Sequence, residues 1–503
     1  MSKKDKKLIL PSDVPLRGAE LTARERLENL FDGGDFFEVD KEVGHRAEFF
    51  DFDQKDIPGD GVITGFGKVN GKTVYAYAQD RSILGGSLGE AHARKICKIM
   101  DLALQAGCPI VGLNDSGGAR IQEGIDALSG YGEIFVRNVK ASGVIPQISV
   151  LMGPCAGGAV YSPALTDFII MVKEKSYMFV TGPKVVKAVT SEDVTTEELG
   201  GASVHSSKSG VANFTVGSEI EALERVRNIL SYLPQNNCTP PPNWEDLVGD
   251  KSTPALDKII PASPNKPYEV KDVISEVFDD GSFLEVHKDF AQNIRVGFAR
   301  LAGRPVGIVA NNPMVNAGVA CIDSSRKAAR FIRMCDSFGL PIISLVDTPG
   351  FMPGTKQESG GIILHGSKLV YAYCEATVPK LTIIMRKSYG GAYICFGSKH
   401  VGTDYVFAFP RAEIAVMGAK GAVEILYAKS LKGLEPEEAA SKAKEHEDKY
   451  NELFANPNVA KKRGYVDSVV DYKDARRSLS VALDSISEKR VQTIPKKHGN
   501  IAT

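Results

Sequence analysis

The feature that most constrains this chain is an internal repeat of about 230 residues, far longer than the units of a solenoid. Matching segments occur in the same order in both halves, and three of the four pairs are separated by 232 or 233 residues. The pairs are residues 31–36 and 278–283, 65–74 and 297–306, 115–118 and 347–350, and 157–159 and 390–392. The sequence therefore predicts a domain duplicated in tandem.

A proline-rich stretch separates the two copies. Residues 234–267 hold eight of the 26 prolines and the only tryptophan, Trp244. Proline at this density prevents continuous helix or sheet, so the stretch is predicted to be a linker. The two expected domains are residues 1–245 and residues 246–503.

Within each copy, short apolar runs alternate with helical stretches. The apolar runs are residues 109–114, 145–152, 341–346 and 380–385, and helices are expected over 89–106 and 325–338. Repeated strand–helix–strand units predict an α/β fold with much parallel pairing. Ligands of such sheets usually bind at the carboxyl ends of the strands.

Glycine-rich turns follow apolar runs in both copies, and they account for part of an unusual total of 49 glycines. Glycine lets a ligand approach the backbone closely, and the first amides of a helix carry partial positive charge. Such amides can stabilise an oxygen that becomes negative during a reaction. One pair alone would indicate only a tight turn, but pairs at matching places in both copies favour function. The turns are residues 85–89, 115–120, 154–159 and 389–393.

Composition and missing motifs exclude several functions. The net charge of −1 argues against nucleic acid as the main partner. The apolar runs are too short to insert into a membrane, and three apolar residues near the N-terminus are too few for a signal peptide, which predicts a cytoplasmic protein. Eight scattered cysteines indicate free thiols and give no reason to expect a metal. No nucleotide-binding loop or nucleophile elbow occurs, which favours chemistry through an enolate with a cofactor carrying the reactive group.

Residues 115–124, 153–164, 415–419 and 497–500 closely resemble the carboxyltransferase (β) subunit of biotin-dependent acyl-CoA carboxylases. The propionyl-CoA carboxylase β type is nearest, and the methylmalonyl-CoA decarboxylase α and large transcarboxylase types are almost as similar. The resemblance implies two tandem crotonase-like domains of the ClpP/crotonase superfamily. It also implies a hexamer built from dimers, with acyl-CoA bound to the N-terminal domain of one subunit and carboxybiotin to the C-terminal domain of its partner.

The resemblance also implies roles for individual residues. The amides of Gly157 and Gly158 would bind the thioester oxygen, and those of Gly391 and Ala392 the ureido oxygen of biotin. Ile394 stands where propionyl-specific members often have aspartate, which leaves the acyl length open, and it could also simply pack. The acyl-CoA site would include Gly86, Ser87, Gly117, Gly118, Ala119 and Ala156, and the pocket for biotin and the acyl group would include Gly390, Tyr393 and Ile394.

The expected reaction moves a carboxyl group from carboxybiotin to the α-carbon of propionyl-CoA or acetyl-CoA. The chain has no Met-Lys-Met biotinylation sequence, so a biotin carboxyl carrier protein is needed, with either a biotin carboxylase or membrane decarboxylase subunits. Two alternatives are the reverse reaction in a sodium-pumping methylmalonyl-CoA decarboxylase and a non-catalytic scaffold paralogue. The chain departs from the family pattern at Arg81-Ser82, usually Phe-Thr, at Ser359, usually aromatic, and at Leu364, usually arginine.

Overall fold

The computed structural model describes residues 20–47, 57–244 and 251–501, and their contacts divide the chain into two units. Unit 1 is Met1–Pro240 and unit 2 is Pro241–Thr503, so the division falls five residues before the predicted one. Trp244 explains the difference, because its ring lies 3.9 Å from the guanidinium carbon of Arg300 in unit 2. Its amide also donates to the carbonyl oxygen of Gly303 over 3.0 Å.

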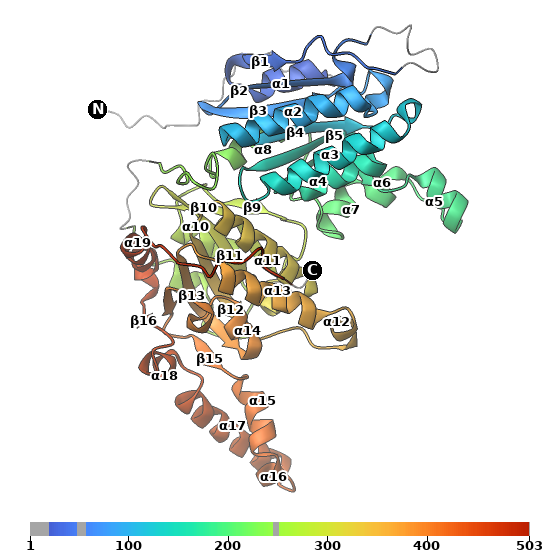
Figure 1. The fold of residues 1–503 in the computed structure, drawn as a ribbon. Coiled ribbons are helices and arrows are strands. Elements are labelled where there is room, and N and C mark those ends of the chain that lie inside the picture. Colours follow the sequence, from blue (N-terminus) through green and yellow to red (C-terminus); the bar gives the residue numbers. More distant parts are fainter. Residues whose placement is uncertain (1–19, 48–56, 245–250, 502–503) are drawn as a thin grey trace. The chain divides into compact units, whose positions relative to one another are not determined.

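Unit 1 is built on one eight-stranded sheet (Figure 1). The spatial order is β1-β2-β3-β4-β5-β6-β8, and β7 pairs with the end of β5. Pairing is antiparallel from β1 to β3 and parallel beyond β3. The strands are β1 (Phe36–Val39), β2 (Val62–Val69), β3 (Lys72–Gln79), β4 (Ile110–Ser116), β5 (Gln147–Ala156), β6 (Phe168–Val172), β7 (Tyr177–Phe179) and β8 (Phe214–Val216).

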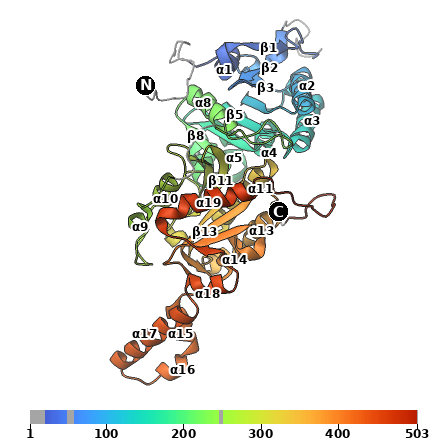
Figure 2. The ribbon, with the colours of Figure 1, turned by 90° about the vertical axis from the view of Figure 1, so that its left-hand side faces the viewer.

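Helices cover both faces of this sheet. The helices of unit 1 are α1 (Ala23–Leu30), α2 (Glu90–Ala106), α3 (Ile125–Ala141), α4 (Tyr161–Leu165), α5 (Pro183–Thr190), α6 (Thr196–Gly200), α7 (Ala202–Ser207) and α8 (Glu219–Leu230). In Figure 2, α1 and α8 lie on one side of the sheet, and α2 and α3 lie on the other. The central strand β4 is therefore buried along its whole length, which explains why its first four residues are apolar without alternation.

Unit 2 repeats this sheet strand for strand. Its order is β16-β14-β13-β12-β11-β10-β9, and β15 pairs with the end of β13, as β7 does with β5. Even an irregularity recurs: the register shifts between Asn114 and Ser116 in unit 1 and between Val346 and Thr348 in unit 2. The strands are β9 (Leu284–Val286), β10 (Ile294–Leu301), β11 (Arg304–Asn311), β12 (Ile342–Thr348), β13 (Lys380–Tyr389), β14 (Tyr405–Ala408), β15 (Glu413–Ala415) and β16 (Ser468–Val469). The predicted α/β duplication is confirmed.

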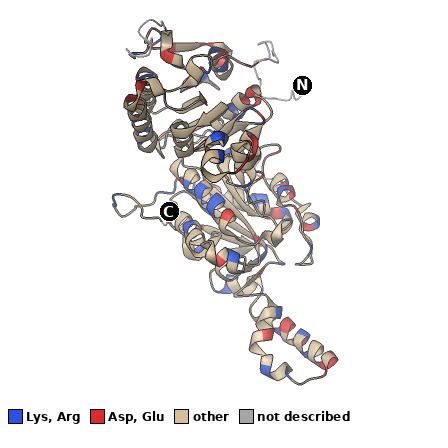
Figure 3. Cartoon of the chain, turned by 90° about the vertical axis from the view of Figure 1, so that its right-hand side faces the viewer, with Lys and Arg blue, Asp and Glu red and all other residues tan. Residues whose placement is uncertain are grey.

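The helices of unit 2 include a group that projects from its sheet. They are α9 (Leu256–Ile259), α10 (Val270–Val277), α11 (Ile322–Ser337), α12 (Thr355–Ser359), α13 (Ile362–Glu375), α14 (Gly390–Cys395), α15 (Ala419–Leu426), α16 (Ala428–Leu431), α17 (Pro436–Leu453), α18 (Pro457–Lys462) and α19 (Ala475–Ser485). Helices α15, α16 and α17 extend away from the second sheet (Figure 1), and α17 carries charges of both signs (Figure 3). Among the helices of the described residues, none has both the length and the apolar character to span a bilayer.

A buried lysine marks the same place in both copies. Lys95 of α2 donates from Nζ to the carbonyl oxygens of Gly59, over 2.9 Å, and Val62, over 2.6 Å. Lys327 of α11, at the matching position, donates to those of His287, Phe290 and Ile294 over 2.7–2.9 Å. Each ammonium thus holds the loop that leads into β2 or β10. Burial lowers the pKa of Lys327 to about 7.

Candidate active site

The glycine turns of unit 1 come together at the carboxyl ends of its parallel strands. The amide of Gly117 donates to the carbonyl oxygen of Gly85 over 3.0 Å, and the amide of Leu88 donates to that of Gly118 over 2.9 Å. A Cβ built on Gly118 would lie 3.1 Å from the carbonyl oxygen of Ala156, which joins the third turn to the other two. The structure thus places one group of predicted residues at one edge of the sheet: Gly86, Ser87, Gly117, Gly118, Ala119 and Ala156.

Ser116 shapes this arrangement from below. Its Oγ donates to the carbonyl oxygen of Gly86 over 2.6 Å and accepts from the amide of Gly118 over 3.3 Å. The hydroxyl is fully buried, so it serves the turns. Gly86 itself has a φ of +68°, which an L side chain rarely adopts.

Gly157 and Gly158 begin a short 3₁₀ turn, Gly157–Val160, directly after β5. The first amides of a helix have no acceptor inside it and carry partial positive charge. Gly157 has a φ of +61°, and a Cβ on Gly158 would lie 2.9 Å from the ring of Tyr131 in α3. Glycine is therefore required at both positions, and both amides start the helix at the edge where the other turns meet.

Unit 2 repeats this turn where β13 passes into α14. Gly390 has a φ of +58°, close to that of Gly157, and its amide is followed by those of Gly391 and Ala392 at the helix start. A Cβ on Gly391 would have only the ring of Phe351 near it, at 3.8 Å. The methyl group of Ala392 is buried. The two amide pairs thus lie at equivalent carboxyl ends of the two sheets.

The remaining predicted residues continue along α14. The hydroxyl of Tyr393 lies 3.2 Å from Nε2 of His400, and burial raises the pKa of Tyr393 to about 12. Ile394 is 44% exposed, so it does not simply pack in the core. Before the turn, the hydroxyl of Tyr389 donates to the carboxylate of Glu413, which ties the end of β13 to β15.

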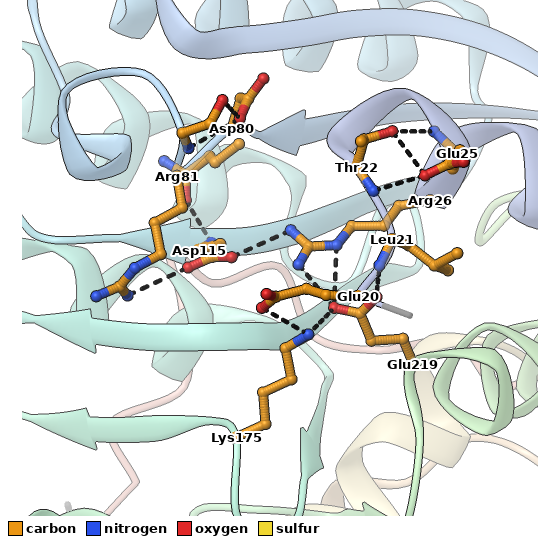
Figure 4. Close-up of polar contacts among 12 residues, drawn as sticks. Glu20, Leu21, Thr22, Glu25, Arg26, Asp80, Arg81, Asp115, Lys175 and Glu219 are labelled. Atoms are coloured by element: carbon orange, nitrogen blue, oxygen red, sulfur yellow. Dashed lines mark hydrogen bonds and ion pairs between the residues drawn. The ribbon is translucent and has the colours of Figure 1, made fainter. Parts of the chain in front are cut away.

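Asp115 lies in a buried ion-pair network beneath the turns of unit 1 (Figure 4). Its Oδ2 accepts from Nη1 of Arg26 over 3.2 Å, and both side chains are about 3% exposed. Arg26 also donates from Nη2 to Glu219 over 2.6 Å, and Lys175 contacts the same Glu219 oxygen at 2.8 Å. Burial raises the pKa of Asp115, while the guanidinium of Arg26 opposes this rise.

The matching aspartate of unit 2 takes its arginine from another element. Asp347 accepts from Nε of Arg386 in β13 and from the hydroxyl of Tyr268, both over 2.9 Å. In unit 1 the position equivalent to Arg386 is Gly153, where a Cβ would lie 2.1 Å from the carboxylate of Asp115. The repeat aligned the two aspartates in sequence, but nothing in it pointed to Arg26, because α1 supplies that arginine from outside the aligned segments.

The departures from the family pattern lie at exposed positions. Arg81 is half exposed and reaches Asp115 with Nη1 at 3.5 Å. Ser359 donates to the carbonyl oxygen of Thr355 within α12, and Leu364 is 44% exposed on α13. None of the three disrupts a glycine turn.

Comparison with known proteins decides the family. Residues 17–501 match the family model described as the carboxyl transferase domain. The chain belongs to this family. It is 54% identical over 485 residues to the propionyl-CoA carboxylase beta chain of Roseobacter denitrificans, covering 96% of this chain and 94% of the relative. It is 52% identical over 485 residues to methylmalonyl-CoA decarboxylase subunit alpha of Propionigenium modestum, covering 96% and 93%.

A solved structure agrees with the family in fold. Transcarboxylase 12S, described as a hexamer with methylmalonyl-coenzyme A and methylmalonic acid bound, superposes with a TM-score of 0.93 and 48% identity. The match covers 96% of this chain and 92% of that one. The predicted family, the tandem crotonase-like fold and the enzyme class are therefore confirmed: this carboxyl transferase family member is a biotin-dependent acyl-CoA carboxyltransferase.

Proposed function

We propose that this chain is the carboxyltransferase subunit of an acyl-CoA carboxylase. It moves a carboxyl group between biotin and the α-carbon of a short acyl-CoA, propionyl-CoA or acetyl-CoA. The observation that carries this proposal is the pair of helix-start amides after β5 and its equivalent after β13. The propionyl-CoA carboxylase relatives support the choice of acyl group.

In unit 1, acyl-CoA lies on the turns that meet at the edge of the sheet. The amides of Gly157 and Gly158 donate to the thioester oxygen, which gains charge when the α-carbon becomes an enolate. Donors fixed in advance stabilise such a charge without reorganising, and removing one typically costs about 3–4 kcal/mol in the transition state. The absence of a side chain matters at Gly158, because a Cβ there would meet the ring of Tyr131 and shift the turn that carries the amide.

In unit 2, biotin occupies the edge of the second sheet. When bound, it supplies the carboxyl group and a ureido nitrogen that can take up a proton. The residues fit this group: the amides of Gly391 and Ala392 start α14, Gly391 is exposed, and little lies near the Cβ that it lacks. These two amides donate to the ureido oxygen. Gly390, Tyr393 and Ile394 line the adjoining pocket, and the exposed Ile394 helps to set the acyl length.

The assembly that we propose follows the family. Residues 1–240 form the acyl-CoA side, and residues 241–503 form the biotin side of a hexamer in which each active site joins two subunits. The hexameric transcarboxylase 12S relative supports this arrangement. A separate carrier protein brings biotin, and a biotin carboxylase charges it. We place the complex in the cytoplasm, where eight free thiols stay reduced.

The reverse reaction in a sodium-pumping decarboxylase is a second candidate, favoured by the methylmalonyl-CoA decarboxylase relative. The same amides serve both directions, so they do not discriminate between the two. A scaffold without activity is disfavoured, because both units keep the amide pair at the start of a helix.

A direct assay tests the proposal. The purified chain is incubated either with a carboxylated biotin carrier and acetyl- or propionyl-CoA, or with free biotin and malonyl- or methylmalonyl-CoA. Transfer of the labelled carboxyl group is followed in each direction. We expect transfer involving propionyl-CoA or acetyl-CoA. Preference for decarboxylating methylmalonyl-CoA would favour the second candidate. No transfer with any ester by the assembled protein would favour the scaffold.

A further inference from the structure

The carbonyl oxygen of Ser87 is held by a buried arginine. Nη2 of Arg120 donates to this oxygen over 3.0 Å, and the Arg120 side chain is 1% exposed. The amide of Arg120 also donates to the carbonyl oxygen of Leu88 over 2.9 Å. The turn that carries Ser87 is therefore joined to the turn of Gly117 and Gly118 by a side chain as well as by backbone.

Two carboxylates fix the guanidinium in this place. Nη1 of Arg120 lies 2.6 Å from Oδ1 of Asp60 and 2.7 Å from Oε1 of Glu123. The second oxygen of Asp60 accepts from the amide of His92 over 2.8 Å, and that of Glu123 accepts from the amide of Glu90 over 2.6 Å. Both carboxylates are thus bound to the first turn of α2, so the arginine links this helix to the Ser87 carbonyl.

Unit 2 holds the equivalent carbonyl without any charge. The carbonyl oxygen of Val319, which matches Ser87, accepts from Nδ2 of Asn293 over 2.7 Å. Met352 stands at the position of Arg120, and its amide donates to Ala320 over 2.7 Å as that of Arg120 does to Leu88. The fold therefore needs a donor at this carbonyl but does not need an arginine, and the buried charges of unit 1 serve something that unit 2 lacks.

We infer that Arg120 is a positioning residue for acyl-CoA. It fixes the Ser87 carbonyl and so the distance between the two turns on which the ester lies. A guanidinium can do this because its planar fork reaches the carboxylates with one arm and the carbonyl with the other. The inference rests on the proposed binding of acyl-CoA to unit 1.

Arg120→Lys tests the inference, because lysine keeps the charge between the carboxylates but lacks the fork. We expect the KM for acyl-CoA to rise about tenfold with kcat within about twofold of the wild type. Asn293→Ala, which removes the matching donor in unit 2, is the control. It should leave the KM for acyl-CoA unchanged and raise that for free biotin. A wild-type KM in Arg120→Lys, or an equal rise in both variants, would overturn the inference.

Glu123→Gln provides the test if the lysine variant does not assemble. Its amide oxygen can accept from Arg120 or from Glu90 but its nitrogen can accept from neither, so we expect the KM for acyl-CoA to rise about threefold. An unchanged KM would count against the inference. Hydrogen exchange of the wild type with free CoA distinguishes failure of this inference from failure of the proposed function. If CoA does not protect residues 82–92 and 115–125, binding to unit 1 is contradicted. If it protects them but the variants keep the wild-type KM, only the role of Arg120 is contradicted.

Discussion

The backbone of Gly86 lies so close to Asp115 that a Cβ at position 86 would be 2.1 Å from the carbonyl oxygen of residue 115. Unit 2 repeats this relationship, since a Cβ on Gly318 would be 2.5 Å from the carbonyl oxygen of Asp347. Both glycines also have a positive φ. The close approach of one turn to the next strand end is thus a property of the duplicated fold.

Gly86→Ala is expected to destabilise the protein by about 3 kcal/mol or more, because the methyl group meets backbone that cannot move aside. Gly85→Ala is the matched control. Gly85 has a similar φ but no atom within 4 Å of the added Cβ, so it should cost only the strain of about 1 kcal/mol. Melting temperatures measured by calorimetry check this difference. Equal losses in the two variants would contradict the steric argument.

Gly158→Val is expected to lower kcat by at least about 10²–10³-fold while the protein keeps its oligomeric state, because the side chain displaces a turn that carries an oxyanion donor. The added Cβ would also lie 2.9 Å from the ring of Tyr131. Gly132→Ala is the control. Gly132 lies next to Tyr131 on α3 but has open space where its Cβ would be, so this change should leave turnover unchanged. Steady-state kinetics and size-exclusion chromatography provide the two readouts. Normal turnover in assembled Gly158→Val would remove the assignment of this amide.

The sequence was informative where structure repeats. The matched spacing predicted two α/β units and placed Gly157 and Gly390 in equivalent turns, and the structure has both features. The contacts divide the chain five residues before the predicted domain boundary, because Trp244 packs on Arg300 of unit 2. The catalytic and ligand-binding roles of the glycine amides stay predictions, because the repeat locates the turns and not the molecules that bind them.

Arg26→Met should destabilise unit 1 by about 3–5 kcal/mol near neutral pH, because it leaves the buried Asp115 without its nearest guanidinium. Burial holds the pKa of Asp115 above its unfolded value, and loss of Arg26 raises it further. The folded state then binds more protons than the unfolded state, so the stability of the variant falls, relative to the wild type, as pH rises.

Melting temperatures at pH 5 and pH 8 check this prediction, with a larger deficit expected at pH 8. Arg24→Met is the control on the same helix. Arg24 forms an ion pair with Glu38 near the surface, and such a pair contributes about 1 kcal/mol or less to the stability. A deficit of Arg26→Met that shrinks as pH rises would contradict the prediction.

Lys327 gives a pH dependence of the opposite sign. Its pKa is about 7 in the folded protein, against an ordinary value near 10.5. Between these values the unfolded state binds more protons, so the stability that depends on this lysine rises with pH. The melting temperature of the wild type relative to Lys327→Met should therefore increase from pH 6.5 to pH 9. Lys442→Met, which removes an exposed pair on α17, should show no such trend.

The sequence did not indicate which cations would pair with the buried Asp115 and Asp347. Arg26 comes from α1 and Glu219 from α8, 193 positions apart, and neither lies in a segment that the repeat aligned. The buried Asp347 instead forms its ion pair with Arg386, which comes from the neighbouring strand. A buried carboxylate predicts that a cation must be near, but only the packing of helices on the sheet decides which one.

The two buried lysines have a consequence for the ionic conditions that the enzyme tolerates. Backbone carbonyl oxygens surround the side-chain nitrogens of Lys95 and Lys327, much as the oxygens of a binding loop surround a free calcium ion. Here the cation is attached to the chain by its own side chain. Because the donor belongs to the chain, it cannot be diluted, chelated or exchanged, so the loops before β2 and β10 need no dissolved cation to hold them.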